Sequence, residues 1–291
     1  MTTQIDADAL RAWVGKTETR SDTIDARPVE LLSATLDRND PQPRHGDVLP
    51  PLWHWLYFLP VYRASEVGPD GHARRGGFLP PVPLPRRMWA GSRIEWLRPL
   101  AIGDEVARHS RIVSVTPKSG RSGALVFVVV RHELSTAAGL ALTEEHDIVY
   151  RDMPPAQASA EQAGVARDVV PGAPTWTRRI APNDVLLFRY SALTFNSHRI
   201  HYDRRYVTEV EGYPGLVVHG PLLATLLVDL LRRNRPEVSL RRFEFRALAP
   251  LFDIAPFDVC GRAGEDDRAD VALWAQGVDG AAAMRATATP A

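Results

Sequence analysis

The sequence predicts an α+β protein made of two strand-rich halves in tandem, in which antiparallel sheets wrap around a central buried helix. Three observations support this prediction. Runs of β-branched residues recur in both halves, a proline-rich stretch separates the halves, and one helix is apolar around most of its circumference. With 291 residues, 45% of them hydrophobic, the chain is long enough to bury a sizeable core.

The boundary between the halves is a proline-rich stretch near the middle of the chain. Residues 154–174 combine prolines with Ala, Gln and Gly, a composition that is typical of linkers. We therefore expect a first domain over residues 1–153, a linker over 154–174 and a second domain over 175–291.

The strand predictions rest on β-branched density and on alternation. The run from Leu125 to Arg131 is dense in valine, as in a sheet that is buried on at least one face. Phe243, Phe245 and Ala247 alternate with polar residues and therefore share a face. The expected strands are 106–115, 124–134, 142–151, 242–248, 257–262, 270–276 and 281–287.

The two halves also resemble each other in sequence. Arg93-Ile-Glu-Trp and Arg242-Phe-Glu-Phe both start a strand with arginine, an apolar residue, glutamate and an aromatic residue. Each is followed by Pro-Leu and then by an acidic turn into the next strand. This echo indicates that one strand-rich unit has been duplicated.

The clearest helix is predicted over residues 220–234, and a shorter one over 26–37. Pro221 suits the first helical position, and Arg232 and Arg233 suit the last turn, where the helix dipole favours cations. Leucines cover a face so broad that this helix must be buried on most sides. A buried helix followed by several long antiparallel strands is the hot-dog arrangement, so the prediction is a tandem (double) hot-dog fold.

Composition excludes several classes of protein. Lys+Arg and Asp+Glu are both 35, so no net charge favours nucleic acid or an acidic membrane as a partner. The single cysteine, Cys260, cannot form an intrachain disulfide or a thiolate metal site. We find neither a secretory signal nor a membrane-spanning run, and we expect a cytoplasmic enzyme without metal or redox cofactor. The edges of such sheets also lead us to expect a homodimer.

Polar and titratable side chains concentrate just before the long helix. Within twelve positions the chain carries Tyr190, Ser191, Thr194, Asn196, Ser197, His198, Arg199 and His201. A second segment then brings His219 and Gly220 to the helix start. A helix start offers unpaired N–H groups and a positive dipole end, which can support the developing charge on a thioester oxygen. Pro221 has no N–H, so Gly220 is the expected donor.

These two segments carry a specific resemblance. Tyr-Ser-Ala-Leu-Thr-x-Asn-x-His-x-Ile-His-Tyr-Asp (190–203) and Gly-Leu-Val-Val-His-Gly-Pro-Leu (215–222) resemble the MaoC-like/FAS1-like dehydratase-domain hot-dog hydratases. Within that family the chain is most similar to the branch of mesaconyl-C4-CoA (3-methylfumaryl-CoA) hydratases and mitochondrial hydroxyacyl-thioester dehydratases. The resemblance covers nearly the whole chain, and it implies that the first half shapes the pocket without itself being catalytic.

The resemblance also implies roles for individual residues. The wider family has Asp followed five residues later by His, and these positions fall on Asn196 and His201. An amide cannot act as a base, so His201 is the expected base and Asn196 the residue that holds the attacking water. The expected thioester-binding residues are Gly220 and His219, with His219 orienting the helix start. The expected substrate-binding residues are Tyr190, Ser191, Thr194, His198 and Arg199.

The expected function is that of an acyl-CoA hydratase, a hydro-lyase that adds water reversibly to an enoyl-CoA. Mesaconyl-C4-CoA or itaconyl-CoA, converted to citramalyl-CoA, is the favoured substrate. Two alternatives remain open: a 3-hydroxyacyl-thioester dehydratase of lipid metabolism, and a non-catalytic acyl-thioester binding module, which Asn196 leaves possible. Arg199 is expected either to bind a free substrate carboxylate or to lie in solvent. The pairs Arg74-Arg75 and Arg86-Arg87 are solvated charges or contacts for the coenzyme A phosphates.

Overall fold

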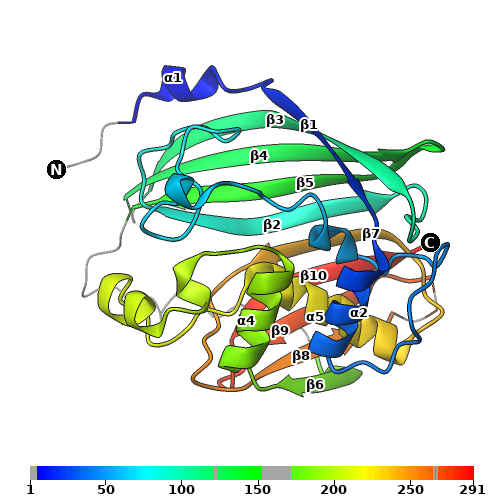
Figure 1. Ribbon diagram of the computed structural model, residues 1–291. Helices are drawn as coiled ribbons and strands as arrows, with labels where there is room; N and C mark the ends of the chain where they lie inside the picture. Colours follow the sequence, from blue (N-terminus) through cyan, green and yellow to red (C-terminus); the bar gives the residue numbers. More distant parts are fainter. Residues whose placement is uncertain (1–4, 121–122, 153–171, 265, 267) are drawn as a thin grey trace.

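The computed structural model describes residues 5–120, 123–152, 172–264, 266 and 268–291. Most of the expected linker, residues 154–171, lies outside the described residues. The described strands form one ten-stranded antiparallel sheet with the order β1-β3-β4-β5-β2-β7-β10-β9-β8-β6 (Figure 1). The tandem hot-dog prediction is therefore confirmed, with the two half-sheets joined edge to edge.

The strands divide evenly between the two halves. The first half contains β1 (Thr17–Thr23), β2 (Arg86–Trp96), β3 (Glu105–Gly120), β4 (Gly123–Thr136) and β5 (Gly139–Arg151). The second half contains β6 (Trp176–Ile180), β7 (Leu240–Ala247), β8 (Phe257–Arg262), β9 (Val271–Gln276) and β10 (Ala282–Pro290). All seven predicted strands are confirmed. Three strands lie outside the expected ranges: β1, β6 and β2, and for β2 the sequence indicates only a strand start at Arg93. In β1 no residue is buried and no apolar period exists.

The halves meet where β2 pairs with β7. In this pairing Arg93 lies opposite Glu244, Ile94 opposite Phe243, and Glu95 opposite Arg242. These are the two segments that echo each other in sequence, so each arginine faces the glutamate of the other copy, a favourable cross-strand pairing. The division into domains at residues 153 and 175 stays a prediction, because the hydrophobic core runs through both halves.

The predicted long helix is confirmed as α5 (Gly220–Asn234). Every residue from Leu222 to Leu231 is buried, and the helix packs against β6, β8, β9 and β10. Its polar interruption, Asp229, is fully buried and binds Arg38, Arg178 and Arg233 at 2.6–2.8 Å. No helix of the described residues is long and apolar enough to span a bilayer.

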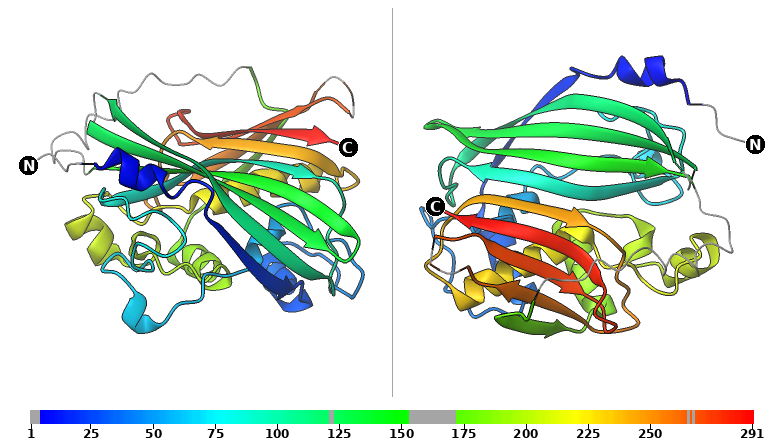
Figure 2. Two further views of the ribbon diagram at one scale, coloured as in Figure 1. Left: turned by 90° about the horizontal axis from the view of Figure 1, so that it is seen from above. Right: turned by 180° about the vertical axis from the view of Figure 1, so that it is seen from behind.

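The first half lacks such a helix among the described residues. Its helices are short: α1 (Ala7–Arg11) lies on β3, and α2 (Ala26–Thr35) packs against α4 (Asp184–Leu193) of the second half. Helical turns occur at Trp53–Leu56 (η1), Ala64–Glu66 (η2), Arg199–His201 (η4) and Tyr206–Val210 (η5). In the two views of Figure 2, α2, α4 and α5 lie on the same side of the sheet. An irregular segment that includes the buried Val82 and Leu84 packs against buried residues of β3, β4 and β5.

Candidate active site

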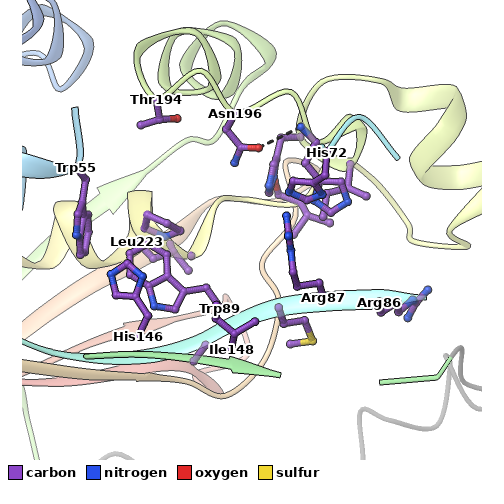
Figure 3. Close-up of a pocket in the computed structure, with 18 of the residues that line it drawn as sticks. Trp55, His72, Arg86, Arg87, Trp89, His146, Ile148, Thr194, Asn196 and Leu223 are labelled. Atoms are coloured by element: carbon purple, nitrogen blue, oxygen red, sulfur yellow. Dashed lines mark hydrogen bonds between the residues drawn. The ribbon is translucent and has the colours of Figure 1, made fainter. Parts of the chain in front are cut away.

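A cavity of about 1640 Å³ is lined by residues of both halves. One wall is the face of β2 and β5 that carries Arg87, Trp89 and Ile148, and the opposite wall carries Thr194 and Asn196 (Figure 3). Leu223 of α5 also lines this space. The second half supplies the segment to which the sequence pointed, and the first half supplies a wall of the cavity, as the resemblance implied.

The turn after α4 brings Asn196 to the cavity. The Phe195 N–H donates to the Ala192 carbonyl at 3.3 Å and the Asn196 N–H donates to the Ser191 carbonyl at 2.8 Å. This is a Schellman ending, in which the residue after the helix adopts the left-handed conformation. That residue is Phe195, with φ 48°, where glycine is the usual choice. The strained turn fixes the start of residues 196–203, the candidate catalytic segment.

The amide of Asn196 has a defined orientation. Its Oδ1 accepts the backbone N–H of His198 at 3.1 Å, so the amide oxygen is the atom that is occupied. The Nδ2 group is therefore left as a donor. A donor can hold the oxygen of a water molecule but cannot take a proton from it. Asn196 lines the cavity and is suited to position a water molecule rather than to act as a base.

The ring of His201 is held in one tautomer. Its Nδ1 lies 2.7 Å from the Val217 carbonyl oxygen, which can only accept, so Nδ1 carries the proton. The lone pair is then on Nε2. His201 is buried and lines the cavity. A neutral imidazole with a free Nε2 is the form that a general base requires.

His219 packs against the His201 ring. The two rings are stacked, with centroids 3.7 Å apart, and His219 Nε2 lies 2.8 Å from the Ser191 hydroxyl. His219 is fully buried as the N-cap residue of α5, and neither it nor Ser191 lines the cavity. Ser191, which was expected to bind the substrate, instead contacts His219, and the stacked His219 ring can fix the position of the His201 ring.

Burial lowers the pKa of His201 to about 4, although the hydrogen bond to Val217 acts in the opposite direction. A group with a lowered pKa stays deprotonated as the pH falls, until the pH reaches that value. The base form of His201 is therefore complete at neutral pH and persists well below pH 6.5.

This lowered pKa predicts the acid limb of the rate profile. We expect kcat/KM for hydration, which reports the free enzyme, to fall with a midpoint near pH 4, and not near 6.5 as for an exposed histidine. The measurement is kcat/KM between pH 3.5 and 8, with enzyme stored at pH 7 and diluted into each assay. Circular dichroism at each pH checks that the fold persists, and a midpoint near 6.5 would contradict this environment for His201.

A loop of the first half is joined to the catalytic segment by its backbone. The Arg199 N–H donates to the Asp70 carbonyl at 2.9 Å, and the Ser197 hydroxyl donates to the Gly71 carbonyl at 2.5 Å. Gly71 has φ 90°, and a Cβ placed there would lie 1.9 Å from the Ser197 carbonyl oxygen. Only glycine permits this close approach. The sequence offered no signal for it beyond an Asp-Gly-His loop.

The same loop brings His72 to the site. The His72 Nδ1 lies 3.3 Å from Asp70 Oδ2, and its ring centroid is 4.1 Å from that of His198. The ring centroids of His198 and His201 are 5.4 Å apart, and the His201 ring is stacked on that of His219. Four histidine rings therefore contact one another in series, in the order His72, His198, His201 and His219. Burial is the main cause that lowers the pKa of each, that of His198 to about 2. These rings are therefore neutral at pH 7.

One group near the site has the composition of a metal site. Ligand atoms of Asp70, His72 and His198 all lie within 4.8 Å of one another. The positive charge of Arg87 acts on both of these histidines, which disfavours a cation between them. The expectation that the enzyme needs no metal stays a prediction.

The structure does not bring Arg199 to the cavity. Its guanidinium binds Asp203 at 2.7 and 2.9 Å, donates to the Pro69 carbonyl and lies over the Tyr206 ring. Of the two roles that the sequence left open, substrate carboxylate or solvent, the structure favours the second, because the Arg199 side chain is 38% exposed while it binds Asp203.

The remaining expected residues reach the cavity. Tyr190, Thr194, His198 and Gly220 all line it. No backbone or side-chain partner of the Gly220 N–H is found in the part of the chain that the structure describes. A Cβ on Gly220 would meet only the Trp89 carbonyl, at 3.9 Å, so a ligand can approach this N–H closely.

A second polar cluster lines the same cavity in the first half. Glu144 is buried and accepts from His54 at 3.0 Å, Trp55 at 3.1 Å and Ser92 at 2.8 Å. Burial acts to raise the pKa of Glu144, but His146 and His54 together hold it well below its usual range. Sequence reasoning missed this cluster. It fixes the Trp55 ring, which packs edge-on against Trp89.

Comparison with known proteins gives a consistent picture. The family model described as hydroxyacyl-thioester dehydratase type 2 matches residues 52–253. The chain is 49% identical to the mesaconyl-C(4)-CoA hydratase of Chloroflexus aurantiacus over 278 aligned residues. The alignment covers 95% of this chain and 96% of that protein. It is 28% identical to the mitochondrial hydroxyacyl-thioester dehydratase type 2 of Schizosaccharomyces pombe, over 82% of this chain and 88% of that protein.

Solved structures agree on the fold. A MaoC-like dehydratase superposes with a TM-score of 0.69 at 14% identity, over 96% of this chain and 98% of that one. A MaoC-like dehydratase from Phytophthora capsici gives a TM-score of 0.65 at 12% identity, over 99% of both chains.

Proposed function

Because the chain belongs to the hydroxyacyl-thioester dehydratase type 2 family and is a hydro-lyase that acts on acyl thioesters, we propose that it hydrates mesaconyl-C4-CoA to citramalyl-CoA. The observation that carries this proposal is the joint exposure of His201, Asn196 and Gly220 to one cavity. A base, a water-holding amide and an oxyanion donor are the groups that hydration of an enoyl thioester requires.

Binding places the thioester carbonyl at the start of α5. The Gly220 N–H donates to the thioester oxygen, and the positive end of the helix dipole supports it. As water adds to the β-carbon, electrons move to this oxygen and an enolate forms. An oxyanion donor of this kind is worth about 3–4 kcal/mol of barrier.

The proton moves through His201. The Asn196 Nδ2 group holds the water oxygen, so that the water hydrogens are free to face His201 Nε2. His201 takes one proton as the water oxygen bonds to the β-carbon. It then returns that proton to the α-carbon of the enolate, which completes the addition and regenerates the neutral ring.

A second candidate function is supported by the size of the cavity. About 1640 Å³ exceeds the roughly 300–1,000 Å³ of common small-molecule sites and is more than a four-carbon acyl group fills. Any volume that coenzyme A leaves unfilled would accommodate the longer acyl chains of a 3-hydroxyacyl-thioester dehydratase. The same base and oxyanion donor would serve dehydration in the reverse direction.

An assay at the enoyl-thioester absorbance separates these functions. We expect turnover with mesaconyl-C4-CoA to exceed turnover with itaconyl-CoA and crotonyl-CoA. A preference for long-chain 3-hydroxyacyl-CoA would instead support the dehydratase. Tight binding without any turnover would support a binding module and overturn the proposal.

Several expectations stay predictions. They are the absence of a metal or redox cofactor, the cytoplasmic location, the homodimer and the lack of nucleic-acid and membrane partners. Coenzyme A thioester is the proposed substrate.

A further inference from the structure

Several arginines lie near the end of the cavity that His72 and His198 line, and their guanidinium groups have different partners. Arg199 is held by Asp203, as described above. Arg86 lies 3.2 Å from a Glu211 carboxylate oxygen and donates to the Glu211 carbonyl at 2.7 Å. Arg75 donates to three backbone carbonyl oxygens of the loop that precedes β2. Each of these guanidinium groups is occupied by the protein itself.

Arg87 has no such anionic partner. It lies on β2 opposite Tyr150 of β5, and its positive charge opposes the rise that burial causes in the pKa of Tyr150. No carboxylate of the described residues forms an ion pair with it. Its side chain rises from β2 toward His72, into the cavity (Figure 3).

The groups near Arg87 form no direct ion pair with it among the described residues. The Asp70 carboxylate keeps its charge but is hydrogen-bonded to His72, whose backbone N–H donates to Oδ1 at 3.1 Å and whose Nδ1 lies 3.3 Å from Oδ2. Burial is the main cause of the low pKa of His72 and His198, and the charge of Arg87 lowers both further. A cation beside neutral rings in a partly enclosed space attracts an anion.

The proposed substrate supplies an anion at the required place. In mesaconyl-C4-CoA the β-carbon, which accepts the water, also carries the free carboxylate. The receptor for that carboxylate must therefore lie beside the water-handling pair of Asn196 and His201. Arg87 is close enough to His198 for its charge to lower the pKa of that ring, and the His198 ring centroid is 5.4 Å from that of His201.

We propose that Arg87 binds the β-carboxylate of the substrate and so selects dicarboxylic acyl thioesters over monocarboxylic ones. This inference rests on the proposed function. A planar guanidinium binds a carboxylate through two parallel hydrogen bonds, which fix the plane of the acyl group as well as its position. The β-carbon is then held with one face toward the water on Asn196.

The test compares two substrates in matched variants. Crotonyl-CoA has a methyl group where mesaconyl-C4-CoA has its β-carboxylate, and hydrogen in place of the β-methyl group. The change in the ratio of their kcat/KM values between wild type and variant therefore isolates the contact of Arg87 with the carboxylate. In Arg87→Met we expect this ratio to fall about 10- to 150-fold, as for the loss of a hydrogen bond to a charged group. Arg87→Lys should recover part of the ratio, because it keeps the charge but not the fork. Arg111→Met, an exposed arginine of β3 outside the cavity, should leave the ratio unchanged.

The outcomes separate this inference from the proposed function. If Arg87→Met keeps the wild-type ratio, the inference is overturned while wild-type turnover of mesaconyl-C4-CoA still upholds the function. If the wild type hydrates crotonyl-CoA but not mesaconyl-C4-CoA, the function itself fails, and the inference fails with it. Where turnover of crotonyl-CoA is too slow to measure, its inhibition constant against mesaconyl-C4-CoA replaces kcat/KM in the ratio.

Discussion

Replacing His201 with Asn is expected to lower kcat for hydration about 10³-fold, within the roughly 10²–10⁴-fold that general acid–base catalysis supplies. The Asn amide can still donate to the Val217 carbonyl, the bond that His201 makes through Nδ1 at 2.7 Å. It cannot replace Nε2 as a base. The variant thus removes the proton carrier and keeps the local hydrogen bond.

Two controls accompany this variant: a test that it is folded, and the replacement of a histidine outside the candidate site. Thermal unfolding should show the variant folded at the assay temperature. His109→Ala changes an exposed histidine of β3 that bonds only to Thr19 by its side chain among the described residues, and it should keep wild-type kcat. Activity within tenfold of wild type in His201→Asn would mean that another group carries the proton.

Replacing Gly71 with Ala is expected to lower kcat/KM about 10²-fold, the effect of a shift near 1 Å in catalytic geometry. The added Cβ would lie 1.9 Å from the Ser197 carbonyl oxygen, a contact that real structures do not contain. Either the loop or the catalytic segment must move, and the bond from the Arg199 N–H to the Asp70 carbonyl is then lost. Steady-state kinetics with mesaconyl-C4-CoA measures the effect.

A matched control separates the clash from backbone strain. Gly15 has φ 88°, close to the 90° of Gly71, but a Cβ there would meet nothing within 4 Å. Gly15→Ala therefore carries the same conformational cost without the collision, and it should keep wild-type kinetics. Equal losses in both variants would show that strain alone, and not the contact with Ser197, disturbs the enzyme.

The sequence could predict the elements that have local patterns. The helix over 220–234 follows from its leucine face and its capping residues, and the seven expected strands follow from β-branched density and from alternation. The motif with Asn196 and His201 pointed to a segment that the structure brings together around one cavity. These features depend on residues that are near one another in the chain.

The rest depends on contacts between distant residues. The pairing of β2 with β7 and the approach of Gly71 to Ser197 need the register of the whole sheet, which periodicity does not contain. The roles of Arg87 and Arg86 depend in the same way on what the folded chain places beside each. One signal was readable: Asp203 follows Arg199 by four residues, a spacing that favours an ion pair on a helical turn.

The most direct test of the central claim is the product formed in isotopically labelled water. The wild-type enzyme is incubated with mesaconyl-C4-CoA in H₂¹⁸O, the thioesters are separated, and their masses are determined by mass spectrometry. We expect citramalyl-CoA that carries one labelled oxygen on the β-carbon, with His201→Asn forming it about 10³-fold more slowly. Recovery of unchanged mesaconyl-C4-CoA from the wild type, alongside hydration of crotonyl-CoA, would contradict the claim that this site hydrates a dicarboxylic thioester.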